Sequence, residues 1–148
     1  MGMQTVHGTV VDIAGRGVLL CGESGSGKSD LALRLIDRGA CLVADDQVCL
    51  SKKRRGVFAS APQKLRGFLE VRGVGIVSMP VTGGTYIRLV VHLTSALNVP
   101  RLPDAEVETL FGQEIHRLKL NAFEQSTPIK IELALGDLSR IGGGGPSD

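Results

Sequence analysis

The chain has 148 residues, a formal net charge of +2 and a hydrophobic fraction of 43%, which together describe one globular domain with a hydrophobic core. Aromatic residues make up only 3% and tryptophan is absent, so the chain lacks the stacking surfaces and the basic excess typical of nucleic-acid binding. No apolar run is long enough to span a bilayer. These properties argue against nucleic acid or a membrane as a partner.

The first elements in chain order are predicted to form a hairpin. Residues 5–13 and 18–21 are apolar runs of strand length, and the turn-forming sequence Ala-Gly-Arg-Gly separates them. After the second strand, residues 28–37 place apolar side chains at helical spacing, and Gly39 stands where a helix commonly ends. The sequence therefore predicts a strand, a glycine-rich loop and a helix in succession.

The glycine-rich loop has the spacing of a phosphate-binding loop. Its sequence GESGSGKS matches a pattern in which glycines let backbone N–H groups turn toward an anion, and a helix N-terminus adds further donors. We expect the loop amides to bind the α- and β-phosphates of ATP, the Lys28 ammonium to bind the β- and γ-phosphates, and the Ser29 hydroxyl to bind Mg²⁺. The candidate nucleotide-binding residues, called the phosphate loop below, are Gly22, Glu23, Ser24, Gly25, Ser26, Gly27, Lys28 and Ser29.

The alternative for the same loop is a flexible surface segment rich in glycine and serine. Short patterns of this kind occur by chance in unrelated loops. Its position between a strand and a helix N-terminus favours the phosphate-binding interpretation.

The next strand, residues 41–44, runs directly into two carboxylates, Asp45 and Asp46. Acids at the carboxyl end of a strand lie at the ligand-binding edge of an α/β sheet. Two carboxylates beside one γ-phosphate can divide the work, because one can bind the metal ion while the other accepts a proton from an incoming hydroxyl. Taken alone, an Asp-Asp pair is about as often a turn or a cap, so the preceding phosphate loop favours the functional interpretation.

The remainder of the chain is predicted to be mostly strands. The expected strands are residues 48–52, 57–59, 68–71 and 86–93. Residues 98–104 are expected to form a loop. The run Lys-Lys-Arg-Arg at residues 52–55 ends in glycine and is most simply a solvated hairpin turn, with an acidic partner surface as its alternative. Residues 129–135 alternate like a strand, but the preceding Thr-Pro favours a helix start, so we expect a helix.

The segment LEVRGVG, at residues 69–75, carries two more candidates. On a strand, Glu70 and Arg72 share one face, while the apolar residues beside them face the other. The simplest interpretation is a cross-strand ion pair followed by a glycine bend. His7, on the first strand, is by itself an ordinary strand histidine.

Residues 1–141 are expected to form the single folded domain, followed by a flexible glycine-rich tail over residues 142–148. The cysteines Cys21, Cys41 and Cys49 have no metal-ligand spacing and sit in apolar runs, as reduced structural thiols do. The sequence shows no signal peptide. We therefore expect a cytoplasmic protein, in the compartment that supplies ATP.

Taken together, these motifs resemble the catalytic domain of HPr kinase/phosphorylase, the bacterial enzyme that phosphorylates a serine of the phosphocarrier protein HPr. The resemblance rests on VHGTVVDIAGRGVLLCGESGSGKSDLALRLIDRGACLVADDQV and on LEVRGVGIV, and it covers residues 6–77 strongly. Phosphate loops are widespread, whereas the early Val-Ala-Asp-Asp strand and the Glu-Val-Arg-Gly-Val-Gly segment are much more specific. The resemblance implies a strand-rich α/β P-loop kinase domain, similar also to phosphoenolpyruvate carboxykinase.

The resemblance also implies the other active-site residues, which are His7, Asp45, Asp46, Glu70 and Arg72. In the mechanism that we expect, Asp45 accepts the proton of the serine hydroxyl, and Asp46 binds Mg²⁺ together with the serine of the phosphate loop. His7 orients this centre, the loop lysine neutralises the leaving oxygens, and Glu70 supports a second metal ion or the partner, with Arg72 beside it. The implied partners are HPr, ATP, inorganic phosphate and pyrophosphate, and the expected assembly is a homo-oligomer.

The chain departs from longer members of this family in two ways. It has no room for their additional N-terminal domain, so it resembles the short form. Residues 123–135 stand where longer members have a Pro-Gly-Arg loop that is tied to phosphorolysis, and here they contain no arginine. We therefore expect a kinase with weak phosphorylase activity.

Two other functions are compatible with a phosphate loop. One is a small-molecule kinase or another P-loop phosphotransferase, but the chain has neither an arginine-rich lid nor an Asn-Lys-x-Asp segment for binding guanine. The other is a non-catalytic nucleotide-binding regulator, whose expected mark is loss of the aspartates, and both are present. The sequence therefore favours the protein kinase.

Overall fold

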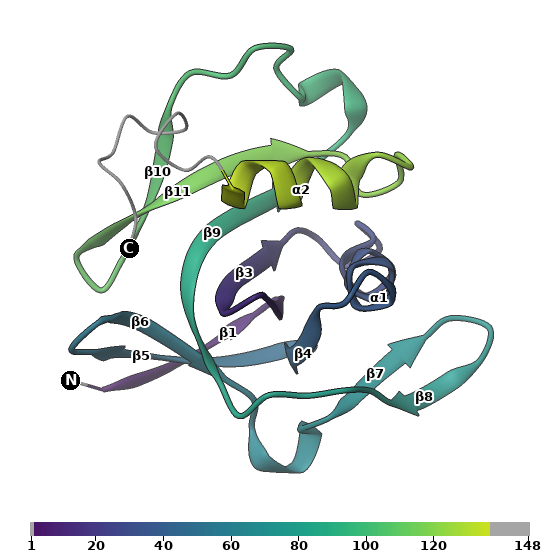
Figure 1. The fold of residues 1–148 in the computed structure, drawn as a ribbon, viewed down its shortest axis with the longest axis vertical. Helices are drawn as coiled ribbons and strands as arrows, with labels where there is room; N and C mark the ends of the chain where they lie inside the picture. The colour runs from purple at the N-terminus through teal and green to yellow at the C-terminus, as the bar shows by residue number, and fades with distance from the viewer. Residues whose placement is uncertain (1, 137–148) are drawn as a thin grey trace.

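The computed structural model of this chain describes residues 2–136. Figure 1 shows a strand-rich α/β fold with a strongly curved sheet. Within residues 2–136 the helices are α1 (Lys28–Asp37) and α2 (Thr127–Gly136), and two short 3₁₀ turns span Gln63–Leu65 and Ala96–Asn98. The strands of the same residues are β1 (Met3–His7), β2 (Thr9–Ile13), β3 (Arg16–Cys21), β4 (Cys41–Ala44), β5 (Gln47–Lys53), β6 (Gly56–Ser60), β7 (Phe68–Val71), β8 (Gly75–Ser78), β9 (Thr85–Leu93), β10 (Glu106–Leu110) and β11 (Gln113–Leu120).

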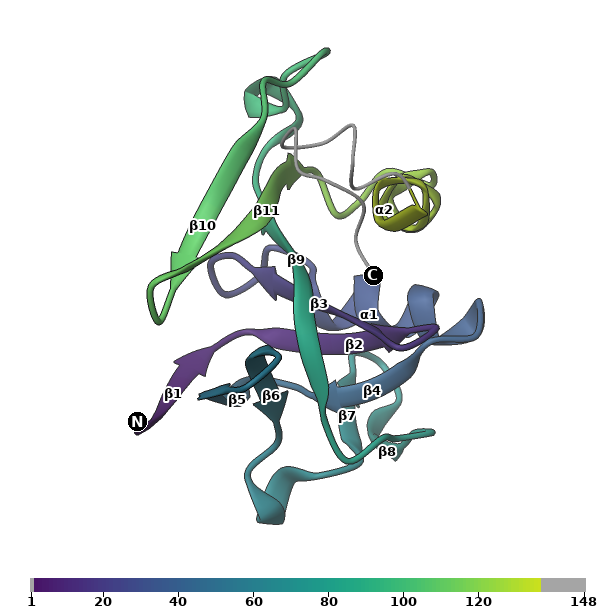
Figure 2. The same cartoon turned by 60° about the vertical axis from the view of Figure 1, so that its left-hand side comes forward.

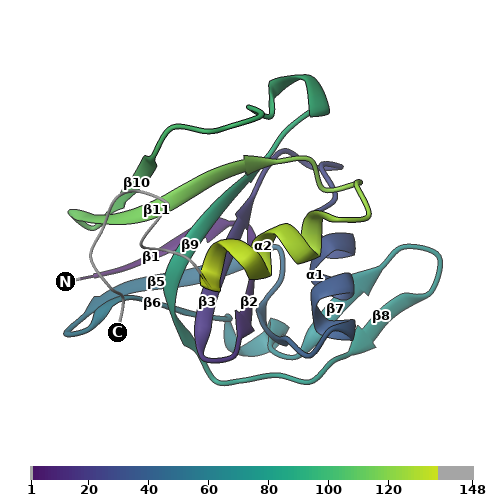
Figure 3. The same cartoon turned by 45° about the horizontal axis from the view of Figure 1, so that its top comes forward.

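Nine of the described strands form one sheet. The long strand β9 joins the part that contains β1, β5 and β6 to the part that contains β2, β3, β4, β10 and β11. The order is β1-β5-β6-β9-β3-β2-β4, with β11 beside β9 and β10 beside β11. The start of β9, at Thr85 and Tyr86, pairs with β6, whereas the rest of β9 lies parallel to both β3 and β11. Strands β7 and β8 form a separate hairpin that packs next to α1 (Figure 3).

Strands β2, β3 and β4 form the central layer, and burial on both faces explains why their sequences are largely apolar. One face packs with the helices through residues such as Val11 and Leu20. The other face packs with β5 and β6 through residues such as Val10, Leu19 and Val43. Each fully buried valine or leucine contributes roughly 1.5–3 kcal/mol. This layer is therefore a firm support for the loops that leave its ends.

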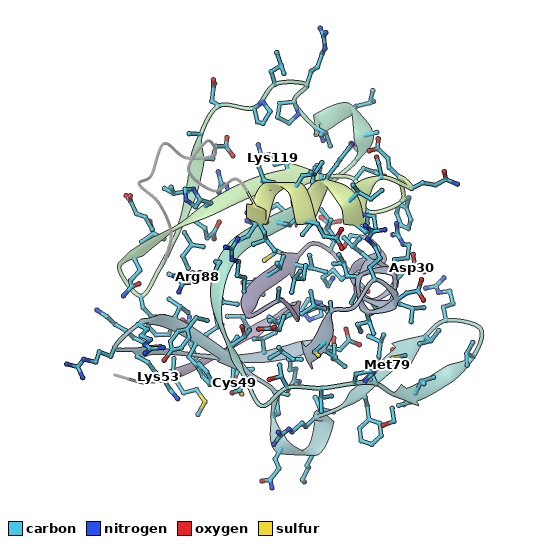
Figure 4. All side chains as sticks on the ribbon, viewed as in Figure 1. Asp30, Cys49, Lys53, Met79, Arg88 and Lys119 are labelled. Atoms are coloured by element: carbon cyan, nitrogen blue, oxygen red, sulfur yellow. The ribbon has the colours of Figure 1, made fainter. Side chains whose placement is uncertain are left out.

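The predicted helices and the cationic turn are confirmed. Helix α1 covers residues 28–37, and Gly39 follows it with a φ of 111°. The helix favoured for the last segment forms as α2. The run 52–55 forms the end of the β5–β6 hairpin, and Figure 4 shows Lys53 on the opposite side of the molecule from Asp30 on α1. The tail expected at residues 142–148 lies outside the described residues.

The prediction of one continuous strand over residues 5–13 is wrong. The chain breaks at Gly8 into β1 and β2, which follow one another in Figure 2 but pair with different strands: β1 with β5, and β2 with β3 and β4. A Cβ at position 8 would lie 3.1 Å from both Leu19 Cδ1 and the Leu20 carbonyl oxygen, so glycine permits this close approach. The sequence conceals the break because strand-like residues continue on both sides of it.

Strands β8, β10 and β11 of the described region are absent from the sequence-based prediction. Strands β10 and β11 carry charged residues at several positions, so their hydrophobic signal is weak. Arg117 on β11 lies 3.3 Å from both Glu106 and Glu108 on β10, and these cross-strand ion pairs accompany the backbone pairing. The turn between the strands has φ values of 52° at Phe111 and 77° at Gly112, the conformation of a tight hairpin.

Three arginines hold α2 and the segment before it against the rest of the domain. Arg16 and Arg34 donate hydrogen bonds to backbone carbonyls of α2 and of that segment. Arg38, just after α1, forms a two-pronged pair with Glu132 on α2 at 2.7 and 2.9 Å. The hydrogen bond from Arg38 lowers the pKa of Glu132. These contacts tie the last described helix to β3 and α1.

The cysteines Cys21, Cys41 and Cys49 are free thiols and are partly buried. Burial, with a smaller contribution from the charge of Glu108, raises the pKa of the Cys21 thiol to about 11. This thiol is therefore protonated and unreactive near neutral pH. Neither helix within residues 2–136 has the length and apolar character needed to cross a membrane.

Candidate active site

The candidate site lies where three central strands end. Strand β2 is antiparallel to both β3 and β4, so its amino end meets the carboxyl ends of its two neighbours. Thr9 on β2 lies opposite Leu20 on β3, and Val10 lies opposite Ala44 on β4. The phosphate loop follows β3 and Asp45 follows β4 at this same edge. The sheet thus brings both sequence motifs to one place.

The phosphate loop adopts a conformation that its glycines require. Gly25 and Gly27 have φ values of 86° and 97°, in the left-handed region. A Cβ on Gly22 would lie 2.4 Å from Ser26 Oγ, and one on Gly27 would lie 2.8 Å from the Ala122 Cβ. The Ser26 hydroxyl oxygen is buried and has no hydrogen-bond partner within the described residues. This compact backbone conformation suits the binding of an anion by the loop N–H groups.

Lys28 is the buried cation of this loop. It is 8% exposed, and its Nζ donates to the carbonyl oxygens of Gly22 at 2.7 Å and Glu23 at 3.1 Å. Within residues 2–136 it forms no ion pair with a carboxylate. Lys28 is itself the first residue of α1, and Gly27 before it provides no side-chain cap. The lysine and the helix terminus together favour a phosphate group at this position.

Asp45 is held by two hydroxyl groups from different elements. Thr9 Oγ1 on β2 donates to Asp45 Oδ1 at 2.9 Å, and Ser29 Oγ in the first turn of α1 donates to the same oxygen at 2.8 Å. Ser29 thus directs its hydrogen to Asp45 and keeps its oxygen lone pairs available for another partner. The sequence-based interpretation assigns Ser29 and Asp46 to one metal ion, whereas the hydrogen bonds join Ser29 to Asp45.

Asp46 occupies a different environment from its neighbour. Its φ of 72° is a left-handed conformation that aspartate adopts more readily than most residues. His7 Nδ1 lies 3.4 Å from Asp46 Oδ1, and the Gly8 N–H donates to the Asp46 carbonyl at 3.2 Å. The side chains of His7 and Asp46 are 56% and 68% exposed. Residues 7–9 therefore hold both aspartates, and Asp46 remains accessible to a substrate.

These groups line one cleft of about 710 Å³. The β7–β8 hairpin adds Glu70, from β7, and Arg72, from the turn after β7. The alternative of a cross-strand ion pair is wrong, because neither residue forms an ion pair within residues 2–136. The predicted site residues that line the cleft are His7, Ser24, Gly25, Gly27, Lys28, Ser29, Asp45, Asp46, Glu70 and Arg72. Gly22, Glu23 and Ser26 of the phosphate loop do not line it.

The cleft also contains residues that the sequence analysis does not identify, chiefly Thr9, Asp30, Leu33 and Phe123. Leu33 lies four residues after Ser29 in α1, so helical spacing could have found it, whereas Asp30, the residue directly after Ser29, has no such signal. Thr9 is a polar residue at the start of an apolar strand, next to His7. Phe123 gives no local signal, because only tertiary packing brings it to the cleft.

The donor set suits Mg²⁺ bound together with a nucleotide. Within residues 2–136 no group of three or more His, Cys, Asp or Glu side chains converges on one point, so the described residues contain no all-protein metal cage of that kind. Ser29, at the end of the phosphate loop, and Asp45 beside it provide hard oxygen atoms. In nucleotide sites Mg²⁺ commonly binds one or two protein oxygens and completes its shell with phosphate and water. The residues present fit this arrangement.

Comparison with known proteins identifies the family. The profile of the HPr Serine kinase C-terminal domain matches residues 2–122. This chain belongs to that family. The phosphate loop, the two aspartates and the Glu70–Arg72 segment all lie within the matched part of this HPr kinase domain.

Individual relatives support the same assignment. HPr kinase/phosphorylase from Bordetella pertussis is 41% identical over 144 residues, which cover 88% of this chain and 47% of that protein. HPr kinase/phosphorylase from Limosilactobacillus reuteri is 39% identical over 121 residues, which cover 74% and 38%. The chain spans about half the length, or less, of these relatives.

A solved structure has the same fold. The Hpr(Ser) kinase/phosphatase from Coxiella burnetii superposes with a TM-score of 0.82 at 28% sequence identity, over 93% of this chain and 91% of that chain. The predicted strand-rich α/β P-loop kinase fold is therefore confirmed.

Proposed function

We propose that this HPr kinase domain transfers the γ-phosphoryl group of ATP to a serine hydroxyl of the phosphocarrier protein HPr. One observation carries the proposal: a single cleft holds a phosphate loop with a buried lysine and two adjacent aspartates in different hydrogen-bonding environments. Phosphoryl transfer needs these groups, because it depends on positioning, charge neutralisation and removal of one proton. The names of the bacterial relatives support HPr as the acceptor.

At the nucleotide end, the phosphate loop binds and orients the phosphates. Lys28 exchanges its bonds to backbone carbonyls for bonds to phosphate oxygens, which carry a full negative charge. Ser29 and Asp45 are the residues that would hold Mg²⁺. When bound, this ion would neutralise the negative charge that develops between the β- and γ-phosphates during transfer.

At the acceptor end, we assign proton acceptance to Asp46, the reverse of the role expected from the sequence. Asp45 Oδ1 already accepts hydrogen bonds from Thr9 and Ser29, and Asp45 is half-buried. The Asp46 side chain is 68% exposed and lies beside His7, so an incoming hydroxyl can reach it. His7 positions the carboxylate, and the phosphate loop presents the γ-phosphate to the hydroxyl from the other side.

The rim of the cleft suits a protein substrate. Glu70 and Arg72 are both exposed there, and they present one charge of each sign to a partner surface. We assign them to HPr contact. We also propose that the protein acts in the cytoplasm and that it forms a homo-oligomer. Light scattering of the purified protein tests the oligomeric state.

The reverse reaction is proposed to be weak. In phosphorolysis, inorganic phosphate attacks phosphoserine, the serine oxygen leaves and takes up a proton, and pyrophosphate forms. The site must then hold two repelling phosphoryl groups, which additional cations stabilise. Residues 123–135 contain no arginine, and Lys130 is bound to Glu124 at 2.7 Å. This segment therefore offers little charge to the reverse reaction.

The test is incubation of the protein with Mg²⁺, HPr and ATP labelled on the γ-phosphate, followed by detection of label on HPr. Asp46→Asn serves as the inactive variant, and Asp37→Asn, at the exposed end of α1, serves as the matched control. We expect labelled phosphoserine with the parent and with Asp37→Asn, and a loss of about 100-fold or more with Asp46→Asn. Transfer of label to a small molecule contradicts the proposal and favours a small-molecule phosphotransferase. Nucleotide binding without any transfer contradicts it and favours a non-catalytic regulator.

A further inference from the structure

Thr9 is a buried hydroxyl residue beside the site, and the roles assigned above do not explain it. It is 0% exposed, and it begins β2, whose next two residues are valines. Valine has nearly the same shape as threonine and suits a buried strand position. A hydroxyl in such a place needs a polar partner, and its partner is Asp45, whose Oδ1 accepts the Thr9 hydrogen at 2.9 Å.

We propose that Thr9 is a positioning residue that fixes the Asp45 carboxylate for binding of Mg²⁺ with the nucleotide, an inference that rests on the function proposed above. Thr9 and Ser29 donate to the same oxygen, Oδ1, one from a strand and the other from a helix. The terminal torsion of aspartate is broad, so two donors that converge on one oxygen restrict an otherwise mobile carboxylate. Both hydroxyls bind Oδ1, which leaves Oδ2 available to a ligand.

The same contact determines how Ser29 is used. Ser29 donates its hydrogen to Asp45 only while the carboxylate keeps this orientation, and its lone pairs are then available to a cation. Without the Thr9 hydrogen bond, the carboxylate is free to rotate away from Ser29. The cost should therefore fall on metal-dependent binding, with little effect on the contacts of the phosphate loop itself.

A second pair of residues has the same chemistry and lies outside the cleft. Thr85 Oγ1 on β9 donates to Asp12 Oδ2 on β2 at 2.5 Å, and Thr85 is 5% exposed. Neither residue lines the cleft. The substitution Thr85→Val thus removes a buried threonine–aspartate hydrogen bond without altering the site, and it is a matched control for Thr9→Val.

The experiment measures binding of a non-hydrolysable ATP analogue by calorimetry over a range of Mg²⁺ concentrations, and again in EDTA. For Thr9→Val we expect the half-saturating Mg²⁺ concentration to rise about 10- to 100-fold, the usual effect of removing a residue that orients a metal ligand. Binding in EDTA should stay at the parent level. Thr9→Ser keeps the hydroxyl and should stay close to the parent, whereas Thr85→Val should lower the melting temperature without changing the Mg²⁺ requirement.

The outcomes separate the possible failures. If Thr9→Val destabilises the domain, Thr9→Ser and Thr9→Ala decide, because both lack the methyl group and only serine keeps the hydroxyl. The positioning role is overturned by any one of three results. These are a parent-like Mg²⁺ requirement in Thr9→Val, equal requirements in the serine and alanine variants, and an equal rise in Thr85→Val. Failure of the parent to bind the analogue with Mg²⁺ instead overturns the proposed function, and the role of Thr9 with it.

Discussion

The cleft and the β10–β11 hairpin use charged residues in opposite ways. On the hairpin side, Glu108 lies 3.0 Å from His92 and 3.3 Å from Arg117, so its charge has partners within the protein. In the cleft, Asp45 is bound by two hydroxyls and Lys28 by two backbone carbonyls. Neither has a partner of full opposite charge among the described residues. The hairpin pairs the charge of Glu108 internally, while the cleft keeps Asp45 and Lys28 available to metal and phosphate.

The pKa of Glu108 shows the consequence of this pairing. Burial alone raises the pKa of a carboxyl, but the hydrogen bonds and charges of His92 and Arg117 outweigh burial and lower the pKa of Glu108. A perturbed carboxylate is often taken as a sign of a catalytic site. Here this perturbed carboxylate lies outside the cleft and marks a stabilising ion-pair network.

The largest expected effect on activity comes from removing Lys28, the buried cation of the cleft. Lys28→Ala removes the side-chain charge that the phosphate loop directs at the nucleotide, so we expect phosphorylation of HPr to fall by on the order of 100-fold or more. Circular dichroism should show an intact fold, and the exposed Lys64→Ala should behave as the parent. A folded Lys28→Ala protein with normal activity would exclude the phosphate-loop mechanism.

The next effect compares a cation in the cleft with a paired cation outside it. Arg72 lines the cleft, whereas Lys130 is bound to Glu124. We expect Arg72→Ala to slow phosphorolysis of serine-phosphorylated HPr by about tenfold and Lys130→Ala to leave it unchanged. Pyrophosphate release in millimolar phosphate measures both, and for the parent it should be slower than the forward reaction. Release as fast as the forward reaction would show that the arginine-free segment has no functional consequence.

A smaller effect concerns stability. Because the pKa of Glu108 is below its ordinary value of 4.5, its contribution to stability is present above that pH and is lost as the pH falls through the lowered pKa. We expect Glu108→Gln to lower the free energy of unfolding by about 1 kcal/mol near neutral pH. Denaturant titrations should show this difference shrinking below about pH 4. A difference that grows in acid would be inconsistent with the ion-pair network.

The smallest effect is expected at the cationic turn. Arg54 and Arg55 lie in the turn between β5 and β6 and do not line the cleft. Replacing both with glutamine should change HPr phosphorylation by less than about twofold, as is usual for exposed charges remote from a site. A large rise in the KM for HPr would instead favour the alternative that this turn contacts an acidic partner surface.

The sequence predicts the phosphate loop and α1 well because their signals are local. The glycine spacing, the Lys-Ser pair and the helical periodicity all lie within residues 22–37, and the structure places these elements as expected. The strand before Asp45 is also local, since four apolar residues precede the acid.

The roles of the two aspartates could not be predicted from sequence because they depend on tertiary structure. The break at Gly8 between β1 and β2 places Thr9 against Asp45 and His7 against Asp46. The left-handed conformation of Asp46 then places the adjacent carboxylates in separate environments. Neither the strand break at Gly8 nor the left-handed conformation of Asp46 has a pattern in the sequence. Polar residues at positions 7 and 9 fit a continuous strand equally well.

The most direct test of the account compares Asp45→Asn with Asp46→Asn in HPr phosphorylation and in Mg²⁺-dependent nucleotide binding. Asparagine keeps the size of aspartate but can neither accept the proton nor provide a charged metal ligand. We expect Asp46→Asn to lower kcat by about 100-fold or more with nucleotide binding unchanged, and Asp45→Asn to raise the Mg²⁺ requirement for binding. The opposite pattern, in which Asp45→Asn abolishes transfer at saturating Mg²⁺ and Asp46→Asn weakens Mg²⁺-dependent binding, would contradict the assignment of the two carboxylates.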